Sequence, residues 1–258
     1  MDMELIVKLN KDLKEAVKVL SPNEIRYLVD MYYAVQDYRK ALASQTREQE
    51  PNALMTFLFE QIHMIEKNIN KALNVWTDHN RMGQWLKDIT GIGPVISAGL
   101  LAHIDIEKAP TVGHIWSFAG LNPLAKWNKG EKRPWNAKLK VLTWKISDSF
   151  VKTSNHPKSV YGPLYQQRKK REIEKNDKLE FKSQAEEILK TKRIGKDTEA
   201  YKYYSQGKLP PAHIDARARR YAVKQFLSDL HGEWYRYHFK TEPPKPYPIA
   251  ILGHAHMR

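Results

Sequence analysis

The chain has 258 residues and a formal net charge of +14, from 43 Lys and Arg against 29 Asp and Glu. A 41% hydrophobic share over this length is enough for one large globular domain or two smaller ones. The absence of cysteine excludes disulfide frameworks, thiolate metal sites and cysteine nucleophiles, and no apolar run reaches the ~20 residues that cross a bilayer. The first residues, MDMELIVKLNKD, lack the basic and apolar regions of a secretory signal.

The positive charge lies in one half of the chain. Residues 1–125 hold 13 Lys and Arg against 15 Asp and Glu, whereas residues 126–258 hold 30 against 14. A basic half of this kind is typical of a surface that binds a polyanion, most often nucleic acid. An acidic protein is a weaker alternative, and so is an anionic membrane surface, because no basic amphipathic segment carries a clean apolar stripe.

The first 82 residues are predicted to form a helical coil or dimerisation region. Apolar residues recur at spacings of three and four within residues 1–20, 21–44 and 53–80, and Ser21-Pro22-Asn23-Glu24 is a helix-start signal. The segment 53–80 is much longer than the usual ~11–12 residues, which indicates either an antiparallel hairpin with the helix before it or a coil that dimerises. An ordinary bundle core is an equal alternative.

Residues 83–150 are predicted to form a helix-hairpin-helix core that binds DNA. The centre is Gly91-Ile92-Gly93-Pro94, with apolar residues at helical spacing on both sides. Glycine permits positive φ and a close approach of the backbone, and proline is favoured at the first position of a helix. Successive N–H groups at such a turn, with the start of the second helix, form a site suited to a phosphate. The alternative is a glycine-rich turn between two core helices.

Basic and aromatic residues alternate in the stretch that follows, from Lys126 to Lys145. Lysine and arginine neutralise phosphates, and tryptophan stacks on exposed bases at about 1–3 kcal/mol each. We expect Trp144 to be buried and Trp127 to contact the ligand. A buried helix face is the alternative for Trp135, Leu139, Leu142 and Ile146. With the hairpin, the predicted DNA-binding residues of this region are Lys87, Gly91, Ile92, Gly93, Lys126, Trp127, Lys129, Lys132, Arg133, Lys138 and Lys140.

The rest of the chain is also predicted to be helical. Residues 151–211 have the composition of a charged helical insertion, and residues 212–258 that of a closing helix and a proline-rich tail. Arg217 and Arg220, near the start of the closing helix, join the predicted DNA-binding residues. The tail carries His254 and His256, but no HExxH-type spacing accompanies them. No metal site and no cofactor are therefore predicted.

Two motifs, ITGIGPVISAGLLAHI at residues 89–104 and FAGLNP at residues 118–123, resemble the C-terminal domain of the insertion-sequence-110 / 116 / 902 transposase family. In that family a long helical segment leads into such a hairpin, and the GLxP turn leads into a basic region. The resemblance covers roughly residues 60–145. It implies a helix-hairpin-helix module that handles DNA.

The chain departs from that family at two places. Those transposases begin with a ribonuclease-H-like domain that carries acidic metal-binding residues, whereas residues 1–80 are too few and too helical to form it. They also carry a nucleophilic serine shortly after the GLxP turn, and no serine occurs here between Ser117 and Ser147. The resemblance therefore implies the family's DNA-handling module, whereas these two departures count against its strand-transfer chemistry; whether the chain is an enzyme stays open, and the catalytic residues are unknown.

Two other function classes stay open. The first is a DNA-processing enzyme, namely a recombinase, a nuclease or a glycosylase, although Asp105 stands closer to the hairpin than the catalytic aspartate of a glycosylase should. The lysine that some glycosylases carry just after the hairpin turn is replaced by Val95-Ile96. The second class is a protein-binding inhibitor from a mobile element.

Together these patterns predict a mostly α-helical protein, with an N-terminal long-helix hairpin or coil, a central helix-hairpin-helix and a basic helical C-terminal half. It is expected to hold the phosphate backbone of duplex or branched DNA and to act in DNA transposition or recombination. Its other expected partners are a second copy, through the N-terminal helices, and a separate catalytic subunit or RNA, with no membrane. The expected location is the bacterial cytoplasm, on the nucleoid, with a bacterial or phage origin.

Overall fold

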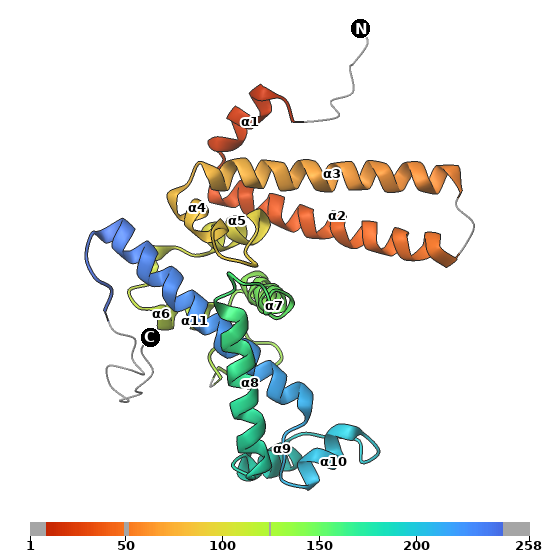
Figure 1. Ribbon diagram of the computed structural model, residues 1–258, viewed down its shortest axis with the longest axis vertical. Coiled ribbons are helices and arrows are strands. Elements are labelled where there is room, and N and C mark those ends of the chain that lie inside the picture. Colours follow the sequence, from red (N-terminus) through yellow and green to blue (C-terminus); the bar gives the residue numbers. More distant parts are fainter. Residues whose placement is uncertain (1–8, 49–51, 124, 245–258) are drawn as a thin grey trace. The chain divides into compact units, whose positions relative to one another are not determined.

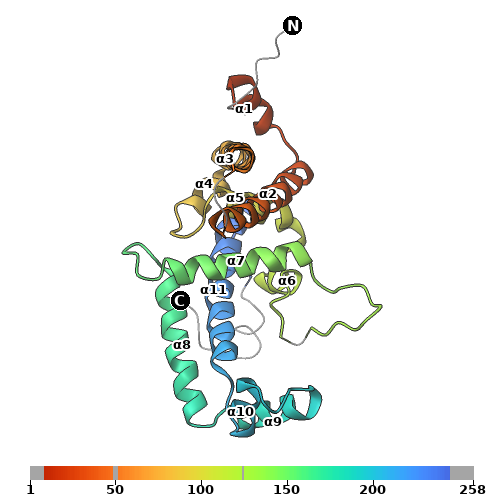
Figure 2. The ribbon, with the colours of Figure 1, turned by 90° about the vertical axis from the view of Figure 1, so that its right-hand side faces the viewer.

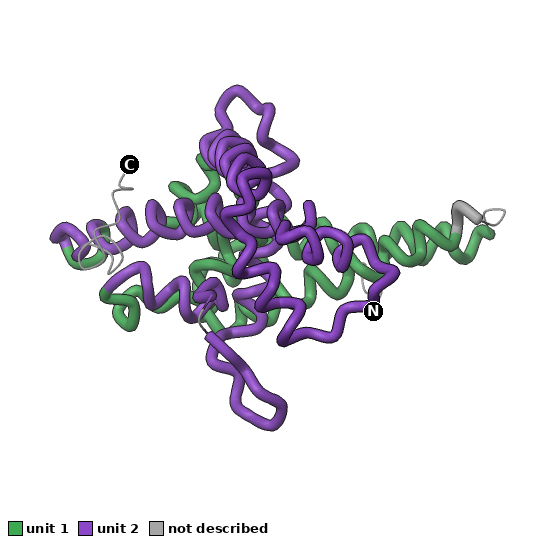
Figure 3. The backbone as a smooth tube through the Cα atoms, turned by 90° about the horizontal axis from the view of Figure 1, so that it is seen from below, with its two compact units in different colours: residues 1–110, 237–239 green, residues 111–236, 240–258 purple. Residues whose placement is uncertain are grey.

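The computed structural model describes residues 9–48, 52–123 and 125–244. Within these ranges the chain forms eleven α-helices, one short 3-10 helix and no strand, which confirms the prediction of a mostly α fold (Figure 1). It divides into two compact units, coloured separately in Figure 3: unit 1 is residues 1–110 with 237–239, and unit 2 is residues 111–236 with 240–258. The boundary after Pro110 falls inside the predicted segment 83–150. The Gly91–Gly93 turn therefore belongs to unit 1, and the basic stretch that begins at Lys126 belongs to unit 2.

Unit 1 is built on two long helices, α2 (Pro22–Glu48) and α3 (Ala53–Asp78), preceded by α1 (Lys11–Lys18). The two lie side by side and antiparallel in Figure 1, so the hairpin is the arrangement observed. Glu66 of α3 is buried between them, with its carboxylate accepting hydrogen bonds from Gln36 Nε2 at 3.1 Å and from Arg39. A buried, satisfied polar group of this kind fixes the register of the two helices.

The end of α3 leads into α4 (Arg81–Lys87) and α5 (Pro94–His103), followed by the 3-10 helix η1 (Ile106–Lys108). Leu73, Leu86 and Leu100, one from each helix, are fully buried together in the core of unit 1. Arg26 of α2 donates from Nε to the carbonyl oxygen of Ala102 at 2.7 Å, which satisfies one of the last carbonyls of α5. The helical pair α4–α5 is therefore held by the long hairpin.

Unit 2 contains α6 (Val112–Phe118), α7 (Ala137–Lys152), α8 (Tyr161–Asp177), α9 (Lys182–Thr191), α10 (Glu199–Ser205) and most of α11 (Pro211–Phe239). Its core is an aromatic cluster in which Phe150, Tyr161 and Phe226 bring α7, α8 and α11 together, with ring centroids 4.8 to 5.5 Å apart. Helix α8 lies alongside α11 in Figure 2. Part of the stretch 151–211, which the sequence assigns to an insertion, thus belongs to this core.

A smaller apolar cluster joins α9 and α10 to the start of α11. Ala185, Leu209 and Ile214 are buried, and Phe181, Ile188 and Tyr204 pack against them. Asn176 at the end of α8 exchanges two hydrogen bonds with the backbone of Leu209, at 2.8 and 3.0 Å. These contacts fasten the two short helices to α8 and α11.

Candidate nucleic-acid interface

The turn between α4 and α5 uses its two glycines differently. Gly91 has φ +96°, in the left-handed region that disfavours any side chain, so the turn itself requires a glycine there. Gly93 has φ −99° and ψ −179°, an extended conformation open to any residue. Ile92 between them is 4% exposed, and its N–H donates to the carbonyl oxygen of Ile89 at 2.9 Å. Ile92 therefore anchors the turn in the core of unit 1.

Gly93 is the N-cap of α5, and the first turn of this helix is open to an external acceptor. Glycine supplies no side-chain cap, and Pro94 at the first helical position has no N–H to satisfy. The amides of Val95 and Ile96 have no intrahelical acceptor at this end. A Cβ built on Gly93 would meet nothing within 4 Å, so there is open space beside the N-cap residue of α5. Two amides, the positive end of a helix dipole and open space together suit a phosphate.

Lys87, predicted to bind DNA, is tied to α3 instead of pointing into solvent. Its ammonium forms an ion pair with Asp78 and donates to Asn74 Oδ1 at 2.9 Å, and its side chain is 17% exposed. Asn74 also donates to Asp78, at 2.8 Å. The positive charge of Lys87 is therefore neutralised within unit 1.

In unit 2, a compact basic loop follows the GLNP turn. Asn128 and Glu131 close it, through two hydrogen bonds from Asn128 to the Glu131 carboxylate at 3.1 and 3.2 Å, and Gly130 takes φ +90° between them. Trp127 donates from Nε1 to the Glu131 carbonyl at 2.8 Å, and the Arg133 guanidinium lies 4.6 Å from the centre of its ring. The predicted contact residues Lys126, Trp127, Lys129, Lys132 and Arg133 are all exposed on this loop.

The FAGLNP motif forms the turn before this loop, and the turn requires glycine at position 120. Helix α6 ends in a Schellman arrangement, with Leu121 N–H donating to the Trp116 carbonyl at 2.8 Å and Gly120 at φ +68°. A Cβ on Gly120 would approach Lys140 to 2.9 Å and Trp135 to 3.0 Å. Lys140 in turn lies over the Trp135 ring, 4.2 Å from its centre. Gly120 is therefore needed both for its conformation and for this close packing.

The expectation that Trp144 is buried is wrong, because this side chain is 61% exposed. Helix α7 turns Leu139, Leu142 and Ile146 into the core of unit 2, as the alternative interpretation anticipated for these three residues. Trp135, the fourth residue of that interpretation, lies before α7 and is only partly buried. Residue 144 falls on the opposite side of a helix with 3.6 residues per turn. The signal was present in the sequence, since the spacing of the three buried residues already excludes Trp144 from their face.

The two arginines of α11 differ in their surroundings. Arg217 donates from Nε to Glu172 Oε2 at 2.6 Å and lies over the Phe181 ring, whereas Arg220 is exposed. Glu172 is fully buried, and Arg168 Nη2 lies 2.5 Å from its other oxygen. Arg217 is thus part of an ion-pair triad around a buried carboxylate, which no local sequence pattern indicates. Arg220 is exposed as a residue, but partial burial and the neighbouring Arg217 lower the pKa of its guanidinium.

Two carboxylates of unit 2, those of Asp148 and Asp215, are paired with basic side chains. Arg219 bridges Asp148 and Asp215, at 3.4 and 2.6 Å, which brings together two acids that are 67 positions apart. Burial alone would raise the pKa of Asp215, but hydrogen bonds from Tyr165, Lys169 and Arg219 lower it to about 2. Among the described residues, no group of three or more His, Asp or Glu side chains is placed to hold a metal ion. His254 and His256 lie outside the described residues.

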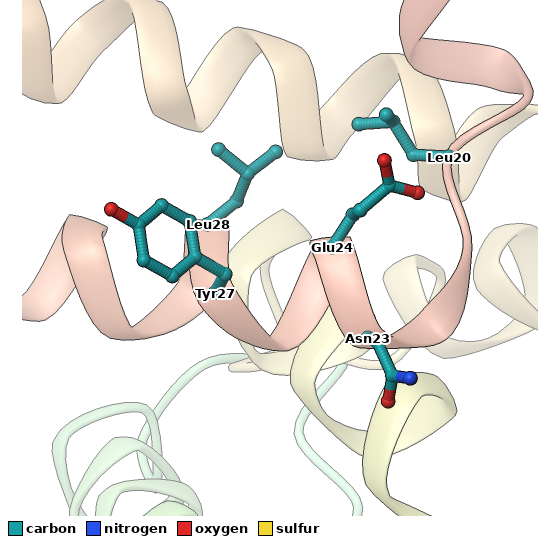
Figure 4. Close-up of a pocket in the computed structure, with 5 residues that line it drawn as sticks. All are labelled: Leu20, Asn23, Glu24, Tyr27 and Leu28. Carbon is teal, nitrogen blue, oxygen red and sulfur yellow. The ribbon is translucent and has the colours of Figure 1, made fainter.

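A shallow hollow lies on unit 1 at the start of α2, lined by Leu20, Asn23, Glu24, Tyr27 and Leu28 (Figure 4). The Glu24 carboxylate accepts hydrogen bonds from Ser21 N and Oγ, each at 2.7 Å, which forms a capping box and lowers the pKa of Glu24. This carboxylate therefore serves the start of α2. In the part of the chain that the structure describes, no helix is long and apolar enough to span a membrane.

Residues 83–133 match the model of the Transposase IS116/IS110/IS902 family. The matched segment runs from α4 through the Gly91–Gly93 turn, α5, α6 and the Gly120 turn to the basic loop. It confirms the resemblance predicted from the two motifs: this part of the chain is similar to a part of those transposases. Neither a curated protein nor a solved structure matches the chain at a significant level.

Proposed function

We propose that this chain is a transposase-related protein that binds the phosphate backbone of DNA through the α4–α5 turn and the basic part of unit 2. The observation that carries the proposal is the open first turn of α5 at Gly93. A free turn of this kind presents amide donors to an anion and leaves room for the bulk of a nucleic-acid backbone. Its position inside the segment that is similar to a transposase supports DNA as the anion.

The exposed cations of unit 2 support a larger footprint. Lys126, Lys129, Lys132, Arg133 and Lys138 are exposed near the start of α7, and Lys140 is exposed on α7 itself. Exposed cations release the counterions of DNA when they meet its phosphates. Lys87 and Arg217 are paired with Asp78 and Glu172, so we give them the role of holding the fold around the binding surface.

The finer parts of the proposal concern partners and process. Exposed apolar side chains on α3, namely Leu54, Phe57, Leu58 and Ile65, support self-association through the N-terminal helices. Action in DNA transposition or recombination, with a separate catalytic subunit or an RNA, stays a prediction from the resemblance, as do the nucleoid and the bacterial cytoplasm as its location.

Gly93→Asp is expected to weaken DNA binding about 10- to 100-fold while leaving the protein at least as stable. The new carboxylate is a favoured N-cap in an extended position, so it satisfies the amides of the first turn of α5 and complements the helix dipole. The same carboxylate occupies the phosphate position and repels phosphate, which removes charge-assisted hydrogen bonds of about 1.5–3 kcal/mol. Fluorescence anisotropy with labelled duplex DNA and a thermal unfolding curve measure the two effects.

Asn23→Asp is the matched control for that variant. Asn23 is exposed in the first turn of α2, also in unit 1, so the substitution changes the net charge by the same amount at another helix start. It should leave DNA affinity within about twofold at moderate salt. Equal affinities of the Gly93→Asp variant and the wild type would remove the α5 turn from the proposal.

A double variant, Lys129→Ala with Lys132→Ala, is expected to flatten the salt dependence of DNA binding. Each phosphate contact contributes a slope of about −0.9 in log K against log salt, so losing two contacts should reduce the steepness by about 2. Lys190→Ala with Lys196→Ala removes the same charge from exposed positions near the far end of unit 2 and should leave the slope unchanged. Equal slopes for both double variants would place the basic loop outside the footprint.

A further inference from the structure

Helix α7 has one face in the core of unit 2 and an opposite face with an unusual composition. Leu139, Ile146 and Phe150 are fully buried, whereas Val141 is 53% and Trp144 is 61% exposed. An exposed aromatic ring with basic side chains beside it is the combination that stacks on bases and neutralises phosphates. The side of α7 opposite the core, which we call the α7 face, consists of the exposed Lys138, Lys140, Val141 and Trp144 and the partly buried Lys145.

Charges surround the apolar centre of the α7 face on both sides. At 100° per residue, Val141 and Trp144 lie within about 60° of each other on the helix. Lys140 then falls on one edge, and Lys138 and Lys145 on the other. The one acidic residue on this side, Asp148, is neutralised by Lys152 at 2.7 Å and Arg219 at 3.4 Å. The α7 face thus places the Trp144 ring between Lys140 on one edge and Lys138 and Lys145 on the other.

The two exposed tryptophans of unit 2 differ in what covers them. One face of the Trp127 ring is covered by Arg133, and its Nε1 is bonded to the Glu131 carbonyl. Among the described residues, no cation and no other aromatic ring stacks on Trp144. The Trp144 ring is therefore available to a flat partner, and its flanking lysines select a partner that carries negative charge.

We propose that the α7 face binds unpaired nucleotides, with a base stacked on the Trp144 ring and the flanking lysines on the adjoining phosphates. Bases in a duplex are already stacked on one another and cannot lie flat on a ring at the surface of a helix, whereas single strands, tails and splayed bases can. The α7 face of a second copy is not a suitable partner, because the lysines of the two faces would repel each other. The inference rests on the proposed nucleic-acid binding and adds the class of ligand.

The test compares Trp144→Ala with the wild type, using the full chain and four labelled probes of one sequence: a blunt duplex, the same duplex with a single-stranded tail, single-stranded DNA and single-stranded RNA. The variant should lose about 5- to 100-fold in affinity for at least one single strand and for the tailed duplex, as expected for one stacked base. Its affinity for the blunt duplex should change by less than about twofold. Trp144→Phe should recover most of the loss, because a phenyl ring still stacks.

Tyr27→Ala is the control, since Tyr27 is an aromatic residue of unit 1 with 70% exposure. It should leave all four affinities unchanged. An equal loss on every probe, or no loss on any, overturns the inference, and so does a Trp144→Ala variant that instead loses self-association. If the wild type binds the blunt duplex but Trp144 affects no probe, the proposed function survives and this inference fails. If the wild type binds none of the probes, the proposed function itself fails.

Discussion

Replacement of Glu172 by alanine is expected to lower the free energy of unfolding of unit 2 by about 2–4 kcal/mol. Glu172 is fully buried and holds Arg168 on one oxygen and Arg217 on the other. Breaking a buried ion pair by removing one partner costs about 3–5 kcal/mol, because the remaining charge stays without compensation. The side chains of Arg168 and Arg217 are 32% and 26% exposed. Water therefore solvates part of the charge that Glu172 leaves behind, and the expected loss is smaller. Urea unfolding followed by circular dichroism measures the loss.

Two further variants separate the charge of Glu172 from its volume. Glu172→Gln keeps the shape and one acceptor for Arg217, so its loss should be smaller than that of the alanine variant. Glu186→Ala removes an exposed carboxylate from α9 and should change stability by less than about 0.5 kcal/mol. If Glu172→Ala unfolds at the same urea concentration as the wild type, the triad does not stabilise unit 2.

Gly83→Ala should destabilise unit 1 by about 3 kcal/mol, although alanine normally favours a helix. A Cβ at this position of α4 would stand 2.2 Å from the backbone oxygen of Thr77 and 2.9 Å from its carbonyl carbon, which no real side chain tolerates. Thr77 is itself fully buried, and its hydroxyl donates to the Leu73 carbonyl at 2.9 Å, so α3 has little room to yield. Overpacking of this kind costs about 1–3 kcal/mol, and a backbone contact lies at the upper end.

The same substitution should also weaken DNA binding, since α4 carries the turn that leads to Gly93. Gly113→Ala is the matched control in α6, another helix of seven residues. A Cβ there would come no closer than 3.4 Å to any atom, so the variant should be neutral or up to about 1 kcal/mol more stable. If the Gly83→Ala variant unfolds at the same temperature as the wild type, α3 and α4 do not pack as closely as described.

The turn between α4 and α5 was predictable in kind, because its determinants are neighbours in the sequence. A glycine with positive φ at Gly91 and a proline at the first position of α5 follow from backbone sterics alone. The roles of the adjoining residues were not predictable. Ile92 turns its side chain into the core and Lys87 turns to Asp78, because packing against α3 decides their direction.

For the basic half, the sequence gives the number of charges and the structure gives their exposure. Its 30 Lys and Arg are countable in the sequence, but which of them face solvent depends on carboxylates elsewhere. Arg217 is neutralised by Glu172, 45 positions away, whereas Lys129 and Lys132 stay exposed on the loop. The position of Trp144 was predictable in part. The spacing of its apolar neighbours places it outside their buried face, but only the structure gives its exposed fraction of 61%, which makes it a candidate contact.

By itself the sequence determined the helical class, the turns at Gly91 and Gly120 and the location of the charge, because each of these depends on composition or on residues within a turn or two of one another. The tertiary structure alone decided which side of each helix is buried, which cations are paired and how close α4 comes to α3. Those outcomes depend on helix packing between segments far apart in the chain, where a single Cβ or carboxylate changes the result.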